Sequence, residues 1–211
     1  MKNVTWSSRF TKQIDAEVLE FSQSLSIDIV LYDADIRVTS AHVEMLNKCG
    51  HIKTSESKKI LMGLNKVRKL ADSGKLPWSI DYEDVHMNIE NALVKIIGEV
   101  GKKIHLGRSR NDLVTTDLRL YLRDFVDIYL HQVRETKYVL ASMAKEYSDA
   151  LFPGFTHMQI AQPVTFGHHL LAWSEMLTRD EQRLESVRHT LNILPLGSAA
   201  LSGTSLKIDR K

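Results

Sequence analysis

Apolar residues recur every three or four positions along most of this chain, which is the spacing of helices that bury one face. The pattern predicts helices over about residues 35–49, 54–72, 83–97, 111–147 and 163–191. Gly50, Gly74 and Gly98 stand where three of these helices should end. Residues 1–30 show no clear pattern, and no segment alternates with period two for long. An all-α fold is therefore expected.

The segment from 111 to 147 contains neither proline nor glycine. As one helix it would be roughly 50 Å long. A small domain cannot bury so long a helix, so it is expected to belong to a bundle, one that several subunits could share. Pro163 suits the first turn of the next helix. The polar stretch 148–162 between the two then reads as a long connecting loop, of the kind that often carries function.

Composition narrows the class of protein. The 211 residues are 43% hydrophobic, and 28 basic against 26 acidic residues give a net charge of +2. This balance gives no reason to expect nucleic acid or a membrane as partner. The single cysteine, Cys49, excludes an internal disulfide. No run of about 18 apolar residues is present, and Met1 to Phe10 do not resemble a secretory signal. A cytoplasmic location is the expectation.

The anion loop, Gly107-Arg108-Ser109-Arg110-Asn111-Asp112, stands directly before the long helix. A helix N-terminus offers free N–H groups and partial positive charge, and two arginines and a serine add further donors. Carboxylate or phosphate would suit such a site. The same residues also fit a simple helix cap with solvated arginines.

A second candidate is Thr156-His157-Met158-Gln159, in the polar stretch. A histidine beside a hydroxyl and an amide can act as a general acid or base near neutral pH. A lone histidine is more often structural or simply exposed.

A third candidate is Glu83-Asp84-Val85-His86-Met87-Asn88. Asp84 and Asn88 lie four residues apart. Acidic residues in the first turn also stabilise a helix simply by interacting with its dipole. No nucleotide-binding glycine motif or H-E-x-x-H is present. His168 and His169 are adjacent and diverge on a helix, and Cys49 is isolated, so no metal site is expected.

Taken together, these segments resemble the argininosuccinate lyases of the fumarase and aspartase superfamily. The resemblance extends from about Ser8 to Arg210. It is carried by residues 101–106, 107–112, 115–120, 152–163, 173–183 and 194–203. Gln159-Ile160-Ala161-Gln162-Pro163 fits many members of the superfamily, whereas Gly107 to Asp112 points to this one.

The resemblance implies an all-helical subunit, with a small N-terminal domain over 1–110 and the first part of a central long-helix bundle over 111–211. It implies a homotetramer whose active sites each draw on three chains. The implied reaction, in arginine biosynthesis, cleaves argininosuccinate into arginine and fumarate by β-elimination, with no metal or organic cofactor. The doubly charged intermediate needs preorganised donors.

The resemblance also implies roles for single residues. His157 would take part in proton transfer to the leaving nitrogen. The expected substrate-binding residues are Ser24, Asp28, Asp84, His86, Ser109, Arg110, Asn111, Thr156 and Gln159.

The chain departs from the family pattern in several places. Ser7 and Ser8 replace two glycines, Leu113 replaces a glutamine, and Ile160 stands where arginine is frequent. The glycine- and serine-rich loop that carries the family's catalytic serine does not occur before Lys211. The chain alone is therefore expected to be an inactive fragment or a truncated product. The alternatives are another fumarate-releasing lyase of the superfamily and a non-catalytic structural protein or remnant of the same fold.

Overall fold

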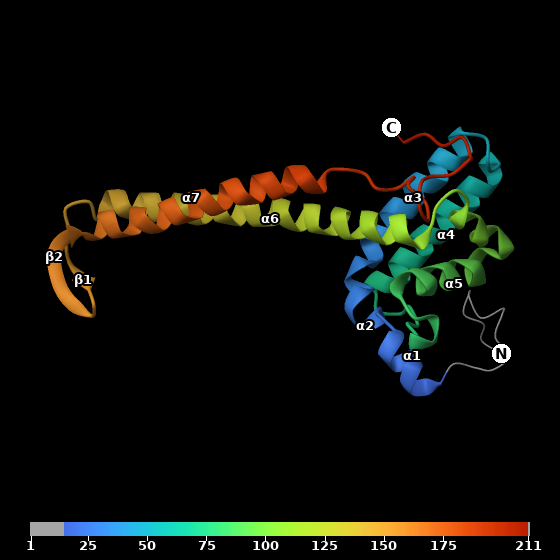
Figure 1. Ribbon diagram of the computed structural model, residues 1–211, viewed down its shortest axis with the longest axis horizontal. Helices are drawn as coiled ribbons and strands as arrows, with labels where there is room; N and C mark the ends of the chain where they lie inside the picture. The colour runs from blue at the N-terminus through green and yellow to red at the C-terminus, as the bar shows by residue number, and fades with distance from the viewer. Residues whose placement is uncertain (1–14, 211) are drawn as a thin grey trace. The chain divides into compact units, whose positions relative to one another are not determined.

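The computed structural model describes residues 15–210 (Figure 1). The first elements are α1 (Ala16–Ser22), α2 (Leu25–Asp28), the 3-10 turn η2 (Ile29–Leu31), α3 (Tyr32–Lys48), α4 (Thr54–Asp72), η3 (Ile80–Tyr82), α5 (Val85–Ile97) and η4 (Glu99–His105). They are followed by α6 (Arg110–Glu146), β1 (Leu151–Thr156), β2 (Gln159–Thr165) and α7 (Phe166–Leu191). The predicted all-α class is confirmed, with one short β-hairpin added to it.

The chain divides into two compact units, each of which is described by itself. Unit 1 comprises residues up to Leu118 together with Leu194 onward, and unit 2 runs from Arg119 to Ile193. Proximity of residues does not test independent folding, so the division into domains 1–110 and 111–211 stays a prediction. The predicted departures at Ser7 and Ser8 lie outside the described residues.

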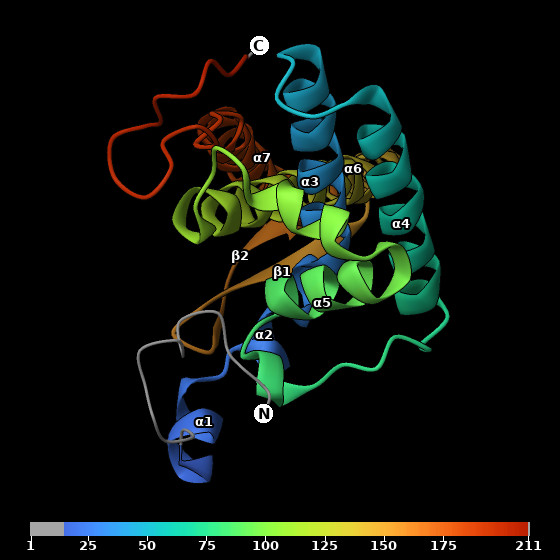
Figure 2. The ribbon, with the colours of Figure 1, turned by 90° about the vertical axis from the view of Figure 1, so that its right-hand side faces the viewer.

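The core of unit 1 is formed by α3, α4 and α5. Figure 2 shows α3 beside α4, and α5 packs against both. Their fully buried apolar side chains are Val43, Leu46, Ile60, Leu64, Val67, Val85, Ile89 and Leu93. Gly63 allows the closest approach of α4 to α5, because a Cβ there would lie 2.6 Å from Leu93 Cδ1. The predicted stripes of α4 and α5 thus face one core.

Most predicted helix ends are confirmed. Gly50, Gly74 and Gly98 all have positive φ values and follow the last helical turns, where glycine adopts this conformation at little cost. The helix predicted over residues 54–72 begins at Thr54, and Lys53 is its capping position. Lys53 N donates to Glu56 Oε2 at 3.0 Å, which satisfies the backbone at that end.

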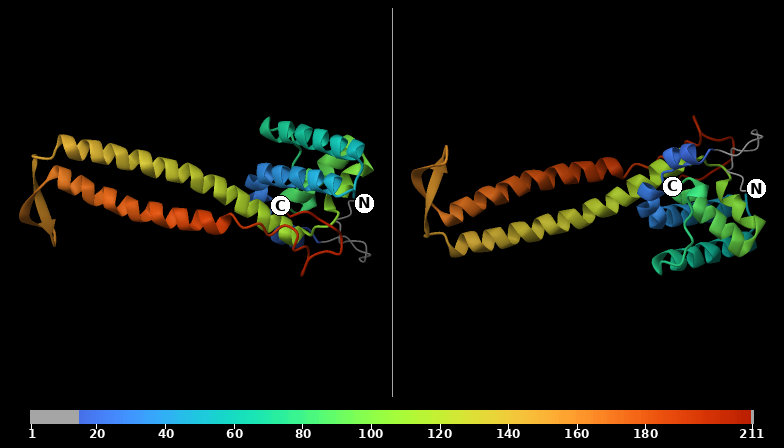
Figure 3. Two further views of the ribbon diagram at one scale, coloured as in Figure 1. Left: turned by 90° about the horizontal axis from the view of Figure 1, so that it is seen from above. Right: turned by 90° about the horizontal axis from the view of Figure 1, so that it is seen from below.

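In unit 2, α6 and α7 run side by side, as both views of Figure 3 show. Ion pairs join the two helices: Arg134 Nε lies 2.6 Å from Glu181 Oε1, and Arg188 Nε lies 2.6 Å from Asp127 Oδ1. The predicted long helix is confirmed within one residue at each end. Much of its apolar surface stays exposed in this chain, including Phe125, Tyr129 and Tyr138.

The stretch expected to be a connecting loop is instead an antiparallel hairpin. β1 and β2 pair from Leu151↔Thr165 to Thr156↔Gln159, with an irregularity between Pro153 and Phe155. The prediction that this helix begins at Pro163 was wrong, because Pro163 lies in β2 and α7 begins at Phe166. Thr165 caps the helix by accepting a bond from His168 N at 3.1 Å. The two prolines and the bulge interrupt the alternation of apolar and polar residues, so the sequence pattern did not indicate strands here.

Candidate active site

The anion loop closes onto the first turn of α6 through reciprocal caps. Asn111 N donates to Ser109 Oγ at 3.3 Å, and Ser109 N donates to Asp112 Oδ1 at 2.9 Å. The bond from Ser109 N to Asp112 is the backward half of a capping box. The helix cap is therefore confirmed, but the solvated arginines of that interpretation are not, because Arg108 is buried. Both Ser109 and Asp112 satisfy backbone N–H groups of the loop.

The two arginines of the loop have different surroundings. Arg108 is buried, its Nη1 donates to Thr39 Oγ1 at 3.0 Å, and burial lowers the pKa of its guanidinium. The expectation that both arginines offer donors to an anion is therefore wrong for Arg108. Arg110 is half-buried, with Nη1 3.4 Å from Asp84 Oδ1. Among the described residues that nitrogen makes no hydrogen bond, and it is itself buried next to the Asp84 carboxylate.

Ser24, Asp28 and Asp84 meet at the N-terminus of α5. Asp84 Oδ1 accepts a bond from Met87 N at 2.7 Å, and Asp28 Oδ1 accepts one from Val85 N at 3.1 Å. Ser24 Oγ donates to Asp28 Oδ2 at 2.6 Å. Burial raises the pKa of the Asp84 carboxyl, and the charge of Arg110 opposes that rise without cancelling it. Four predicted site residues, these three and Arg110, are thus brought together.

The residue before Asp84 has a strained backbone. Glu83 has a φ of 66°, and Asp84 N donates to Tyr82 O at 2.6 Å, which closes a γ-turn. Ser24 N and Leu25 N both donate to Glu83 O, at 2.9 and 3.2 Å. Such conformations cost free energy and persist only where neighbours enforce them. The start of α2 supplies that enforcement and so fixes where Asp84 points.

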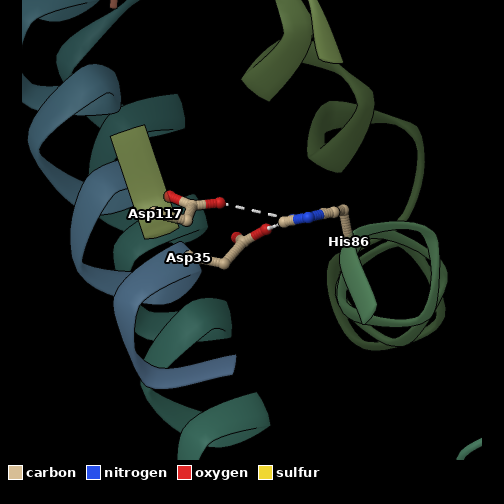
Figure 4. Close-up of side chains that lie close together, drawn as sticks. All are labelled: Asp35, His86 and Asp117. Carbon is tan, nitrogen blue, oxygen red and sulfur yellow. Dashed lines mark hydrogen bonds and ion pairs between the residues drawn. The ribbon is translucent and has the colours of Figure 1, made fainter. Parts of the chain in front are cut away.

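The imidazole of His86 faces the interior and directs its Nδ1 toward two carboxylates, from α3 and α6 (Figure 4). Its Nδ1 is hydrogen-bonded to Asp35 Oδ2 and lies 3.4 Å from Asp117 Oδ2. The His86 residue is 4% exposed and Asp117 is 0% exposed. This side chain is directed toward the core. A contact of His86 with substrate stays a prediction.

The two carboxylates of this cluster titrate in opposite directions. Burial, and then the charge of Asp35, raise the pKa of Asp117 to about 9. Burial would also raise the pKa of Asp35, but the hydrogen bond and charge of His86, with Arg108, lower it instead. The three side chains present donor atoms within 4.8 Å of one another, a set that could hold a cation.

Sequence reasoning did not single out several polar residues of this region: Asp35, Glu90, His105 and Asp117. His105 Nε2 and Glu90 Oε2, for example, lie 2.6 Å apart. A usable signal exists on α3, where Asp35, Thr39 and His42 continue the buried stripe of Val43 and Leu46. Polar side chains on an apolar face need partners. Leu113, in contrast, is 1% exposed and so fits its apolar surroundings where the family has glutamine.

Thr156, His157 and Gln159 belong to unit 2, at the end of the hairpin. Thr156 pairs with Gln159, and the two residues between them, His157 and Met158, have φ values of 52° and 60°. A two-residue turn with both φ values positive normally takes asparagine and glycine. His157 is exposed, and Met158 is 98% exposed. The tip therefore presents a histidine on a strained backbone, a feature that clusters at functional sites.

Comparison with known proteins places these features in context. The model of a lyase family matches residues 8–211. The argininosuccinate lyase of Chromohalobacter salexigens is 49% identical over 208 residues, which are 99% of this chain and 44% of that protein. That of Alkalilimnicola ehrlichii is 51% identical, over 98% of this chain and 44% of its own length. The chain thus spans less than half the length of these relatives.

Solved structures give the same picture of the fold. A crystal structure of EDDS lyase in complex with formate is 33% identical, with a TM-score of 0.76, over 91% of this chain and 37% of that one. The β-carboxy-cis,cis-muconate cycloisomerase of Acinetobacter calcoaceticus shares the fold at a TM-score of 0.66 and 21% identity, over 90% of this chain and 44% of that one. Among residues 15–210, no helix has both the length and the apolarity of a membrane span.

Proposed function

The chain belongs to the lyase family, and from that membership we propose that it serves the cleavage of argininosuccinate into arginine and fumarate. Identities of about 50% to argininosuccinate lyases, over nearly the whole of this chain, support that choice of substrate. Because the chain covers 44% of those relatives, the activity is proposed for the complete gene product.

One observation carries the proposal: Arg110 stands at the N-terminus of α6, and its guanidinium is half-buried beside the Asp84 carboxylate. β-Elimination develops negative charge on the substrate carboxylate, and preorganised donors in a partly buried site stabilise it strongly. Arg110, Ser109 and Asn111 are proposed as these donors. Asp84 and Asp28 are proposed to hold the cationic guanidinium end, with Ser24 supporting Asp28.

His157 is proposed to pass a proton to the departing nitrogen, with Thr156 and Gln159 binding the substrate beside it. A histidine can exchange protons near neutral pH. Its place on a strained two-residue turn supports a functional role, because an unstrained turn could use asparagine and glycine. A substrate-binding role is also proposed for His86, through its position next to Asp84 on α5.

A cytoplasmic homotetramer is proposed as the working assembly. Exposed apolar side chains on both helices of unit 2 support it, because so much apolar surface is rarely left in water. These side chains are Phe125, Ile128, Tyr138, Val139, Leu171, Trp173 and Val187.

The direct test is fumarate release from argininosuccinate by the complete gene product. Arg110→Ala and His157→Asn should each lower kcat/KM at least about 100-fold, the usual scale for an oxyanion donor or a general acid. Lys58→Ala, an exposed change on α4, should leave the rate within about twofold and serves as the control. Activity of the unmodified protein on malate or adenylosuccinate, but not on argininosuccinate, would overturn the proposed substrate.

A second candidate is favoured by one observation, the 33% identity to EDDS lyase. Including EDDS beside argininosuccinate in the assay separates the two. Turnover of EDDS alone would transfer the proposal to that substrate.

A further inference from the structure

The carboxylate of Asp112 contacts backbone N–H groups from two distant parts of unit 1. Its Oδ1 accepts the bond from Ser109 N within the anion loop. Its Oδ2 accepts bonds from Gly197 N at 2.9 Å and from Ala199 N at 2.7 Å. Asp112 is 3% exposed, so these bonds are shielded from water. Charge-assisted bonds of this kind are stronger than neutral ones.

Residues 195–203, here called the C-terminal turn, are shaped to make this contact. Ala199 has a φ of 52°, an unfavourable conformation for a residue with a Cβ. Gly203 N donates to Ser198 O at 2.7 Å and closes the turn. Arg210 Nε donates to Leu196 O at 3.1 Å and supports its beginning. The strain at Ala199 persists because two N–H groups converge on one carboxylate oxygen.

A second bond joins the same two segments. Asn111, which precedes Asp112, donates from its Nδ2 to the O atom of Ala200, which follows Ala199, at 3.3 Å. At the other end of the loop, Leu106 O lies 2.8 Å from His42 Nε2 on α3, and Arg108 is anchored on Thr39. The loop is thus held to α3 at its start and to the C-terminal turn at its end.

We infer that Asp112 is a positioning residue that clamps the anion loop to the C-terminal turn. The proposed donors Ser109, Arg110 and Asn111 then keep the geometry that a carboxylate requires. A displacement of about 1 Å in such a site can cost on the order of 100-fold in rate. The catalytic consequence rests on the proposed function, whereas the clamp itself is a property of the fold.

Hydrogen exchange of the complete gene product tests the clamp without any activity. In Asp112→Ala, amides of residues 107–111 and 196–200 should both exchange at least about tenfold faster under conditions of local opening. Val67→Ala removes buried apolar volume on α4 and lowers stability, but it should leave both segments protected. Unchanged protection of either segment in Asp112→Ala would overturn the clamp.

Kinetics on the proposed substrate test the consequence. Asp112→Ala should lower kcat/KM about 100-fold, whereas Val67→Ala and Ala199→Gly, which keeps its N–H, should stay within about threefold. Asp112→Asn keeps one acceptor oxygen, so its kcat/KM should lie between that of Asp112→Ala and that of the unmodified protein. A simple loss of stability would instead lower the amount of active protein and leave KM unchanged.

The two failures are distinguishable. If the unmodified protein releases no fumarate but Asp112→Ala opens both segments, the proposed function fails and the clamp stands. If the unmodified protein is active and Asp112→Ala retains its kcat/KM within threefold, the positioning role fails and the proposed function stands.

Discussion

Two carboxylates that face the same nitrogen of His86 carry different charges in unit 1, and their different partners, not their burial, are the reason. Asp35 has the hydrogen bond from His86 and stays ionised, whereas Asp117, 0% exposed, keeps its proton to a pH of about 9. The lowered pKa of Asp35 adds stability that is lost only as the pH falls through it. Asp117 acts in the opposite sense.

The sign for Asp117 follows from proton binding. The unfolded chain releases this proton near pH ~4, but the folded chain keeps it to about 9. Between these values the unfolded state binds fewer protons, so stability falls as the pH rises. The stability that Asp117 contributes is complete below its pKa in the unfolded chain, and it is lost once the pH reaches its pKa in the folded chain. In Asp117→Asn this loss disappears.

The expected result is a flatter dependence of the unfolding temperature on pH. Between pH ~5 and ~8 the decrease in Tm should shrink by at least about 4 °C in Asp117→Asn, measured by scanning calorimetry. Asp127→Asn is the control, because Arg188 lowers the pKa of that exposed carboxyl. An equally steep decrease in Asp117→Asn and the unmodified protein would contradict a protonated Asp117.

At the scale of elements, two turns that carry proposed site residues have strained backbones, in addition to the C-terminal turn at Ala199. Glu83 precedes Asp84, and His157 with Met158 closes the hairpin. Neither turn uses glycine, although glycine would relieve the strain. Local sequence therefore does not favour these conformations, and the surrounding bonds enforce them.

Met158 allows a clean measurement of that strain. Met158→Gly and Met158→Ala both remove the exposed side chain, but only glycine adopts φ near +60° freely. We expect Met158→Gly to be more stable than Met158→Ala by about 1 kcal/mol. Amide exchange of residues 151–165 should accordingly be slower in the glycine variant. Equal exchange in both would mean that the turn is unstrained.

At the scale of the whole molecule, the long helices present more apolar surface than a lone chain normally keeps. Tyr138 is 72% exposed and Val139 lies next to it. Their burial against further copies is the simplest way to remove this surface from water.

Charge placed on this surface should prevent assembly. We expect the complete gene product to have the mass of a tetramer by light scattering, and the double variant Tyr138→Glu with Val139→Glu to be smaller. Gln132→Glu adds a charge at an exposed polar position of the same helix and should leave the mass unchanged. A double variant that keeps the tetramer mass would place the interface elsewhere.

The sequence by itself determined the five longer helices, most of their ends and the position of the anion loop, but not α1 and α2. Apolar spacing and glycine caps are local, and they do not depend on which segment lies opposite. The hairpin over residues 151–165 escaped detection because strands gain stability from pairing and need not alternate when neither face is buried. Ser24, Asp28 and Asp84 were recognised through family resemblance, but their joint capping of α5 was not.

Only the tertiary structure decided which charges meet. Asp35, His86 and Asp117 come from three helices, and Asp112 meets Gly197 and Ala199 across 85 and 87 residues of chain. Whether a carboxylate is ionised, neutral or bound to backbone N–H groups depends on the groups packed around it and on its distance from water. Those groups are brought together by burial of the apolar faces, and this is the information that residue spacing does not contain.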